Sequence, residues 1–295
     1  MNDKKMIWGH IVGIITVLCW GGTFINTKYL IMGGLKPHEI FFLRFLIAYI
    51  CIWFISPRRL FCDHWKDEAL MVLIGITGGS LFFQAENMAV ALSYTTNVSF
   101  IGCTAPLITT CMAIAMVKSV KADTRLVLGS LIALAGVGIV IFNGQFVLHL
   151  NPLGDLLALL SAMAWAVYSL LMKRASSRYG AVFITRKVFF YGLITILPMF
   201  AIEPWTFPLR DFLKPTIWLN LLFLGFVASF VCFALWSWVI RKIGAMKASN
   251  YIYLNPITTV IASAIFLDEP MTIMAYVGSA LILVGVYVSN QAKGI

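Results

Sequence analysis

Apolar runs of about twenty residues recur along almost the whole chain. A helix of that length crosses the hydrocarbon core of a bilayer, since each residue adds about 1.5 Å along the helix axis. Of the 295 residues, 61% are hydrophobic and only 12% are charged. A soluble domain of this size needs far more charge on its surface. The pattern therefore predicts an all-α membrane protein.

Ten transmembrane helices are predicted from these runs. They lie near residues 7–31, 38–55, 69–92, 95–117, 125–142, 152–172, 181–201, 217–240, 246–267 and 271–291. The basic start, Met1 to Lys5, resembles that of a signal peptide. The apolar run behind it is too long, however, and it carries no small-residue cleavage site, so we expect a retained first helix.

The net charge of +10 follows the expected topology of the chain. With the N-terminal side called inside, fifteen Lys and Arg residues fall inside, and only Lys36, Arg210 and Lys214 fall outside. Positive charge collects on the cytoplasmic side of membrane proteins. We therefore expect both termini in the cytoplasm. The charge is explained by the lipid bilayer, and no nucleic acid partner is predicted.

The second half of the chain repeats the first. Pro106 corresponds to Pro256 at a spacing of 150 residues, and Gly75 corresponds to Gly225. Trp20 corresponds to Trp165 at a spacing of 145 residues. Five helices per copy is an odd number, so the second copy must enter the membrane from the opposite side. The sequence thus predicts two inverted five-helix repeats, at 7–142 and 152–291, with a site between them near the midplane.

The paired prolines are predicted hinges. Pro106 and Pro256 each remove a backbone hydrogen bond from a helix, and in a bilayer the freed groups need a partner or a wet cavity. A static kink satisfied by neighbouring helices is the plain alternative. Because the prolines occur twice at equivalent positions, we favour hinges.

Aromatic and uncharged polar side chains near the middle of the spans are candidate substrate contacts. Trp20 and Trp165 lie far from the interface, where tryptophan is usually found, so a wall of a central cavity is the favoured role over plain packing. The full set of candidates is Trp20, Glu86, Trp165, Tyr168, Trp236, Asn250, Tyr251 and Asn255. Such a lining suits a zwitterion or a planar molecule better than a nucleotide sugar. The adjacent Gly21-Gly22 pair indicates either an opened helix or close helix packing, and both remain open.

Glu86 is the most informative single residue. Burying an ionisable side chain within a membrane span costs free energy unless the side chain is paired or in contact with water. Such a residue is a functional candidate by default. An ion pair between Glu86 and Arg44 would be a purely structural alternative, since the two lie at similar depth. Arg44 has a rough counterpart in Arg186, whereas Trp236 stands at the position equivalent to Glu86. We favour a substrate contact or a proton relay for Glu86.

No metal site or cofactor is predicted. The six cysteines show no paired spacing, and the run Cys62-Asp63-His64 has no distant partners that would complete a ligand set. A membrane-embedded enzyme acting on lipid-type substrates would need clustered acids or an exposed nucleophile. The acids here are mostly single, so an enzyme is a weaker alternative, and a channel lacks visible rings of charge.

Several stretches resemble the EamA-type transporters of the drug/metabolite transporter superfamily. They are Met88 to Thr96 followed by Ala105-Pro106, Trp238, Lys247 to Pro256, and Phe266-Leu267-Asp268-Glu269-Pro270. The resemblance covers about residues 10 to 290. One departure is that the first copy has Lys118-Ser119 where the family usually carries Gly-Glu.

The resemblance implies a ten-helix carrier of the inner membrane that exports amino acids or related metabolites and is not an enzyme. Uptake of a vitamin or nucleobase is the alternative among carriers. In that fold the fifth and tenth helices lie outside the cavity. This agrees with the small residues and the scarcity of polar groups at 125–142 and 271–291, which suit packing against lipid, other helices or a second subunit. The sequence therefore does not decide whether the chain forms a homodimer.

Overall fold

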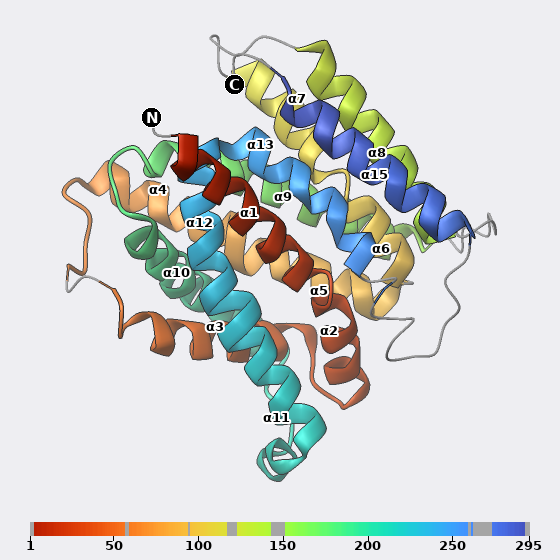
Figure 1. The fold of residues 1–295 in the computed structure, drawn as a ribbon. Coiled ribbons are helices and arrows are strands. Elements are labelled where there is room, and N and C mark those ends of the chain that lie inside the picture. The colour runs from red at the N-terminus through yellow and green to blue at the C-terminus, as the bar shows by residue number, and fades with distance from the viewer. Residues whose placement is uncertain are drawn as a thin grey trace.

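The computed structural model describes residues 3–56, 59–93, 95–116, 123–142, 151–258, 261 and 273–292. Within these ranges the chain is helical and contains no strand. The helices form one bundle, and Figure 1 shows the two chain ends on the same side of it. We call this side the N-terminal side and the opposite one the far side.

The first half of the chain forms the elements that follow from residue 3 to residue 142. They are α1 (Asp3–Trp20), α2 (Thr23–Met32), α3 (Pro37–Ile52), α4 (Trp65–Gly75), the π-helical η1 (Ile76–Ser80), α5 (Leu81–Leu92), α6 (Thr95–Gly102), α7 (Ala105–Met116) and α8 (Thr124–Phe142).

The second half forms a matching series. It comprises α9 (Pro152–Ala175), α10 (Ala181–Ile202), the 3₁₀ turn η2 (Leu209–Leu213), α11 (Pro215–Leu222), the π-helical η3 (Phe223–Val231), α12 (Cys232–Ile243), α13 (Ala245–Ser249), the 3₁₀ segment η4 (Asn250–Leu254), a helical turn at 255–258 and α15 (Ile273–Asn290).

Among the described residues, six helical stretches are long and apolar enough to cross a membrane. They are Met6–Met32, Trp65–Leu92, Val98–Met116, Pro152–Ala175, Ala181–Ile202 and Pro215–Ile243. The other predicted spans coincide with α3, α8, α15 and the segment from α13 to residue 258, which are shorter in the described part of the chain. The helical membrane class is confirmed, whereas ten crossings remain a prediction.

Interruptions of the helices recur at matched places in the two halves. The π-helical segments η1 and η3 both lie near the middle of a span, between α4 and α5 and between α11 and α12. π-Helical turns add a residue to a helix and are frequent at functional sites. At Gly78 in η1 a Cβ would lie 2.2 Å from the Tyr168 ring, so only glycine lets this span approach α9 so closely.

Two helices stand apart from the rest of the bundle. Figure 1 shows α8 and α15 running side by side along one edge, and their contact is the most extensive between any two described elements. A Cβ at Gly129 would lie 2.4 Å from the backbone nitrogen of Ser289, and one at Gly285 would lie 2.4 Å from that of Ala133. The helices are therefore in backbone contact, as small residues permit in a membrane.

Candidate substrate cavity

A cavity lies in the middle of the bundle and is bounded by both halves of the chain. Its empty space is about 650 Å³, open solvent at its mouth included. The lining side chains come from seven helical stretches and are mostly aromatic or small. They are Trp20, Thr23, Phe24, Arg44, Phe82, Phe83, Glu86, Ser99, Gly102, Cys103, Ala105, Ser161, Ala162, Trp165, Phe233, Ile252 and Asn255.

Two groups of helices face each other across this cavity. The first wall group is α5, α6, α7 and α9, which pack closely on one another. The second wall group is α1, α12, α13 and η4, which are likewise joined. Each group draws helices from both halves of the chain. A relative movement of the two groups would therefore open or close the cavity.

The cavity extends from the middle of the bundle towards the far side. Glu86 lies near the far end of the stretch Trp65–Leu92, and Ser99 lies at the far end of Val98–Met116. On the N-terminal side, side chains with no exposed surface fill the bundle, among them Met71, Tyr168 and Trp236. The cavity is thus closed towards the N-terminal side.

Rings that join the two wall groups form the floor of the cavity. The Trp20 and Trp165 rings meet edge to face, with their centroids 5.3 Å apart at 86°. Phe233 of the second wall group also meets Trp165 edge to face, 5.9 Å away, and Trp236 supports Trp20 within the second wall group in a tilted contact at 5.1 Å. Such edge-to-face contacts are favourable beyond the area that the rings bury.

The two indole N–H groups differ in their partners. Trp20 Nε1 donates a hydrogen bond to the Ala228 carbonyl at 2.8 Å. Trp165 Nε1 is buried and has no hydrogen-bond partner in the described part of the chain. A buried donor without a partner costs free energy, so Trp165 is suited to donate to an acceptor brought by a ligand.

The charged groups of the cavity are Arg44 and Glu86. The predicted direct ion pair between them is not formed, and this is a correction. The guanidinium of Arg44 instead lies 4.1 Å from the centre of the Phe83 ring, and its Nε donates to the Ser229 hydroxyl at 2.9 Å. Both charges still line the same cavity. A cation and an anion are therefore presented to one ligand space.

Of the predicted substrate contacts, Trp20, Glu86, Trp165 and Asn255 line the cavity. The other four lie outside this lining, and their contact with substrate stays a prediction. Tyr168 and Trp236 have no exposed surface and pack within the floor. Tyr251 is held away by a hydrogen bond to His10 Nδ1 at 2.5 Å, and Asn250 is fully buried beside it in η4.

Both predicted hinges follow an interruption of their helix. Pro106 is the second residue of α7, after the break that ends α6 at Gly102. Pro256 follows the 3₁₀ segment η4. The Gly21-Gly22 pair separates α1 from α2, and a Cβ at Gly21 would lie 2.8 Å from the Asn255 carbonyl oxygen. The glycine pair therefore both breaks the helix and permits close packing.

Several lining residues were not predicted from the sequence. Ser99 and Ser161 are hydroxyl groups within apolar runs, and that pattern was a usable signal. Phe24, Phe82 and Phe83 carried none, because the chain contains 22 phenylalanines and most simply pack.

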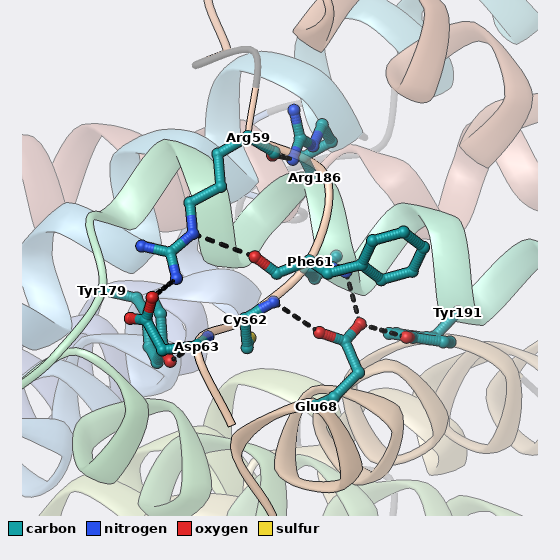
Figure 2. Close-up of polar contacts among 9 residues, drawn as sticks. Arg59, Phe61, Cys62, Asp63, Glu68, Tyr179, Arg186 and Tyr191 are labelled. Atoms are coloured by element: carbon teal, nitrogen blue, oxygen red, sulfur yellow. Dashed lines mark hydrogen bonds and ion pairs between the residues drawn. The ribbon is translucent and has the colours of Figure 1, made fainter. Parts of the chain in front are cut away.

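A second polar cluster lies at the N-terminal side, where the segment between α3 and α4 meets α10 (Figure 2). Glu68 forms an ion pair with Lys187 and accepts a hydrogen bond from Tyr191, both on α10. Its second oxygen accepts the Cys62 backbone N–H at 2.7 Å. Asp63 forms an ion pair with Arg59. We call these contacts the strap.

Further contacts extend the strap to the turn between α9 and α10. Asp67 accepts hydrogen bonds from Arg178 Nη1 at 2.9 Å and from the Tyr179 hydroxyl at 2.9 Å. Burial raises the pKa of Tyr179 to about 12. Burial, together with the nearby Glu68 carboxylate, raises the pKa of the Cys62 thiol to about 11. Both groups are therefore protonated at neutral pH.

A bundle of apolar helices around a central cavity that is closed on one side is typical of membrane transport proteins. The particular family is shown by comparison with known proteins. The model of the EamA-like transporter family matches residues 7–142 and 152–291. The chain belongs to this family, as its sequence led us to expect.

The chain is similar along its length to proteins described as transporters. An uncharacterized transporter of Archaeoglobus fulgidus is 24% identical, covering 99% of each chain. A probable amino-acid metabolite efflux pump of Escherichia coli is 23% identical, covering 95% of this chain and 93% of the relative. A solved crystal structure of another protein matches with a TM-score of 0.75 at 18% identity, covering 98% of this chain, and supports the fold alone.

Proposed function

We propose that the chain is a secondary carrier that exports amino acids or related small metabolites by alternating access. The observation that carries the proposal is the cavity, because it lies between wall groups drawn from both halves and is closed on one side. A carrier needs such a site, reachable from one side at a time. We place it in the inner membrane with both termini in the cytoplasm, on the distribution of its basic residues.

The chemistry of the cavity favours a zwitterion. Glu86 offers an anion to a substrate amine, and Arg44 offers a cation to a carboxylate. The rings of Trp165 and Phe82 offer apolar surface to a side chain, and their centroids lie 4.9 Å apart. A single guanidinium is a poor anchor for the two phosphates of a nucleotide sugar.

The named relatives support export. Besides the Escherichia coli protein, a probable amino-acid metabolite efflux pump of Salmonella typhimurium is 24% identical over 94% of this chain. Uptake of a planar vitamin or nucleobase is the alternative that the aromatic walls leave room for.

Counterflow in liposomes tests the proposal. Purified protein is reconstituted in vesicles preloaded with one unlabelled solute, and entry of the same labelled solute is followed. Amino acids of different side chains form the main panel, with nucleobases, vitamins and a nucleotide sugar as comparators. We expect transient, saturable accumulation for one or more amino acids. Protein-free vesicles provide the baseline.

Counterflow confined to a nucleobase or vitamin would replace the substrate class and leave the carrier mechanism standing. Non-saturable flux of many solutes would contradict a carrier altogether. The orientation is checked separately with a membrane-impermeant thiol reagent. In a variant with Cys62 as its only cysteine, labelled at alkaline pH because burial raises the pKa of this thiol to about 11, Cys62 should be reached only from the cytoplasmic face.

A further inference from the structure

Helix α10 lies between the two wall groups at the N-terminal side, where the cavity is closed. On one side it packs along α4 and η1, which continue α5 of the first wall group. On the other side it packs against α12 of the second wall group, in a less extensive contact, and it also packs along α3, which belongs to neither wall group. If the wall groups part at this side, α10 must leave one of them.

The contact with α4 and η1 is close and strongly polar. The strap joins Glu68 of α4 to Lys187 and Tyr191 of α10 (Figure 2), and the Lys187 side chain is only 3% exposed. Farther along, the hydroxyls of Ser80 in η1 and Thr195 in α10 lie 2.7 Å apart. Separating these helices would leave a buried ammonium and a carboxylate without partners, which is strongly unfavourable.

The strap also satisfies backbone groups of an irregular segment. Glu68 accepts the N–H of Cys62 at 2.7 Å, and the Tyr179 hydroxyl accepts the N–H of Asp63 at 3.2 Å. Arg186 of α10 donates to the Arg59 carbonyl. Non-helical backbone at the edge of a membrane needs such partners. Separating α10 from α4 would therefore also remove hydrogen bonds that hold the segment between α3 and α4 in place.

The contact with α12 is of a different kind. Its hydrogen bond joins the hydroxyls of Thr185 and Ser237, 2.6 Å apart and both fully buried. Around it the contact is apolar, with the Phe189 and Phe233 rings 5.8 Å apart. No ion pair joins α10 to α12 in the described residues. A neutral hydroxyl pair and tilted apolar rings separate far more readily than a buried ion pair.

From these two unlike contacts we infer that α10 moves with the first wall group, and that the N-terminal side opens by separation of α10 from α12 at Thr185 and Ser237. The inference rests on the proposed carrier function, since it describes how the cavity would be reached from the N-terminal side. The strap then holds α10 to α4 in every conformation, and its ion pairs and hydrogen bonds stay formed during transport.

Two matched cysteine pairs on the same helix test the inference. In a variant with all six native cysteines replaced, Thr185→Cys is combined with Ser237→Cys, and Ser80→Cys with Thr195→Cys. Each pair replaces a hydroxyl contact of nearly the same length. Copper phenanthroline oxidises the two thiols to a disulfide, which mass spectrometry confirms and dithiothreitol reverses. Counterflow of the substrate is measured before oxidation, after it and after reduction.

We expect oxidation to abolish counterflow reversibly in the Thr185/Ser237 pair and to leave it within about twofold in the Ser80/Thr195 pair. Loss in the Ser80/Thr195 pair, or retention in a fully oxidised Thr185/Ser237 pair, overturns the inference. Failure of the proposed function shows itself differently, because the cysteine-free parent would then give no counterflow before oxidation.

A second comparison requires no crosslink. Thr185→Val keeps the shape of the side chain, removes the hydroxyl and leaves Ser237 unpaired in the closed state. It should raise the exchange rate several-fold. Thr195→Val, on the clamped contact of the same helix, should not. An equal effect of the two variants would contradict the assignment of the moving contact.

Discussion

The ring of Trp20 meets the ring of Trp165 edge to face, 5.3 Å apart, and this contact joins the second wall group to the first at the floor of the cavity. The two residues occupy matched positions of the two halves of the chain. Any relative movement of the wall groups must change the contact. The floor is thus the place where a bound substrate and the conformation of the carrier affect each other.

Replacing Glu86 by Gln should weaken substrate binding about 10- to 100-fold, because a charge-assisted contact of about 1.5–3 kcal/mol is lost. No side chain among the described residues forms a hydrogen bond or direct ion pair with Glu86, so folding should be little changed. Binding is measured by calorimetry and folding by the thermal midpoint in detergent. If the variant is destabilised yet binds with normal affinity and pH dependence, Glu86 is a structural residue.

Trp165→Phe should weaken binding more than Trp20→Phe. Both variants keep an aromatic ring in the floor. Only Trp165 has an indole N–H left for a ligand, since that of Trp20 is bonded to the Ala228 carbonyl. We expect a difference of about 1 kcal/mol, or roughly fivefold in Kd. Equal affinities would exclude a donor role for Trp165.

Pro106→Ala and Pro256→Ala should each slow counterflow several-fold while leaving substrate affinity nearly unchanged, because a restored helix stiffens the exchange between conformations. Pro198 provides the control, since it lies inside α10, which runs unbroken through it. Pro198→Ala should keep its turnover. Unchanged turnover in Pro256→Ala would show that Pro256 only kinks its helix and does not act as a hinge.

Gly129→Ala should destabilise the protein by about 1–3 kcal/mol, because the new methyl group would meet the backbone of Ser289 at 2.4 Å, and backbone cannot move aside as a side chain does. Gly102→Ala is the matched control, since its added Cβ would have no atom within 4 Å apart from its chain neighbours and the backbone of its own helix. Thermal midpoints in one detergent compare the two variants. Similar midpoints would show that α8 and α15 are not in tight contact.

Cys62 should react slowly with maleimide at neutral pH. A pKa of about 11, against an ordinary value of 9.0, lowers the fraction of reactive thiolate at pH 7.5 about a hundredfold. The rate should rise with pH until about 11. Glu68→Gln removes a neighbouring negative charge, so the pKa falls and the rate at pH 7.5 rises.

The measurement uses a variant in which Cys62 is the only cysteine. Glu86→Gln, on the other side of the bundle floor, is the control and should leave the pH profile unchanged. A profile centred near the ordinary pKa of 9.0 in the unmodified strap would contradict the burial of Cys62 beside Glu68.

The class of fold was predictable because the length and hydrophobicity of the apolar runs decide it. The repeat was visible because equivalent residues such as Pro106 and Pro256 recur at a similar spacing. The cavity was predictable only in part. Trp20, Glu86 and Trp165 differ from their apolar surroundings, so they could be singled out. Tyr168 and Tyr251 differ as much, yet they face packing, because helix rotation is set by neighbours that sequence does not reveal.

The strap was not predictable at all. Glu68 and Lys187 are far apart in the sequence, and each reads as an ordinary charge near the end of a span. The π-helical segments were equally hidden, since Gly75 and Gly225 indicated a repeat but not an extra residue in the turn. Long-range pairing and backbone irregularity depend on tertiary packing, for which one sequence contains no local pattern.

The backbone contact between α8 and α15 has a consequence for biosynthesis. The glycine face of α8 leaves the ribosome well before α15, its partner near the end of the described chain, is made. During that interval Gly129 and Gly136 face lipid or an assisting protein, and the first half cannot complete its own fold. Helix α15, which is made later than α8, therefore completes the assembly of the first half. A nascent chain halted before α15 should be recognised and degraded by membrane quality control.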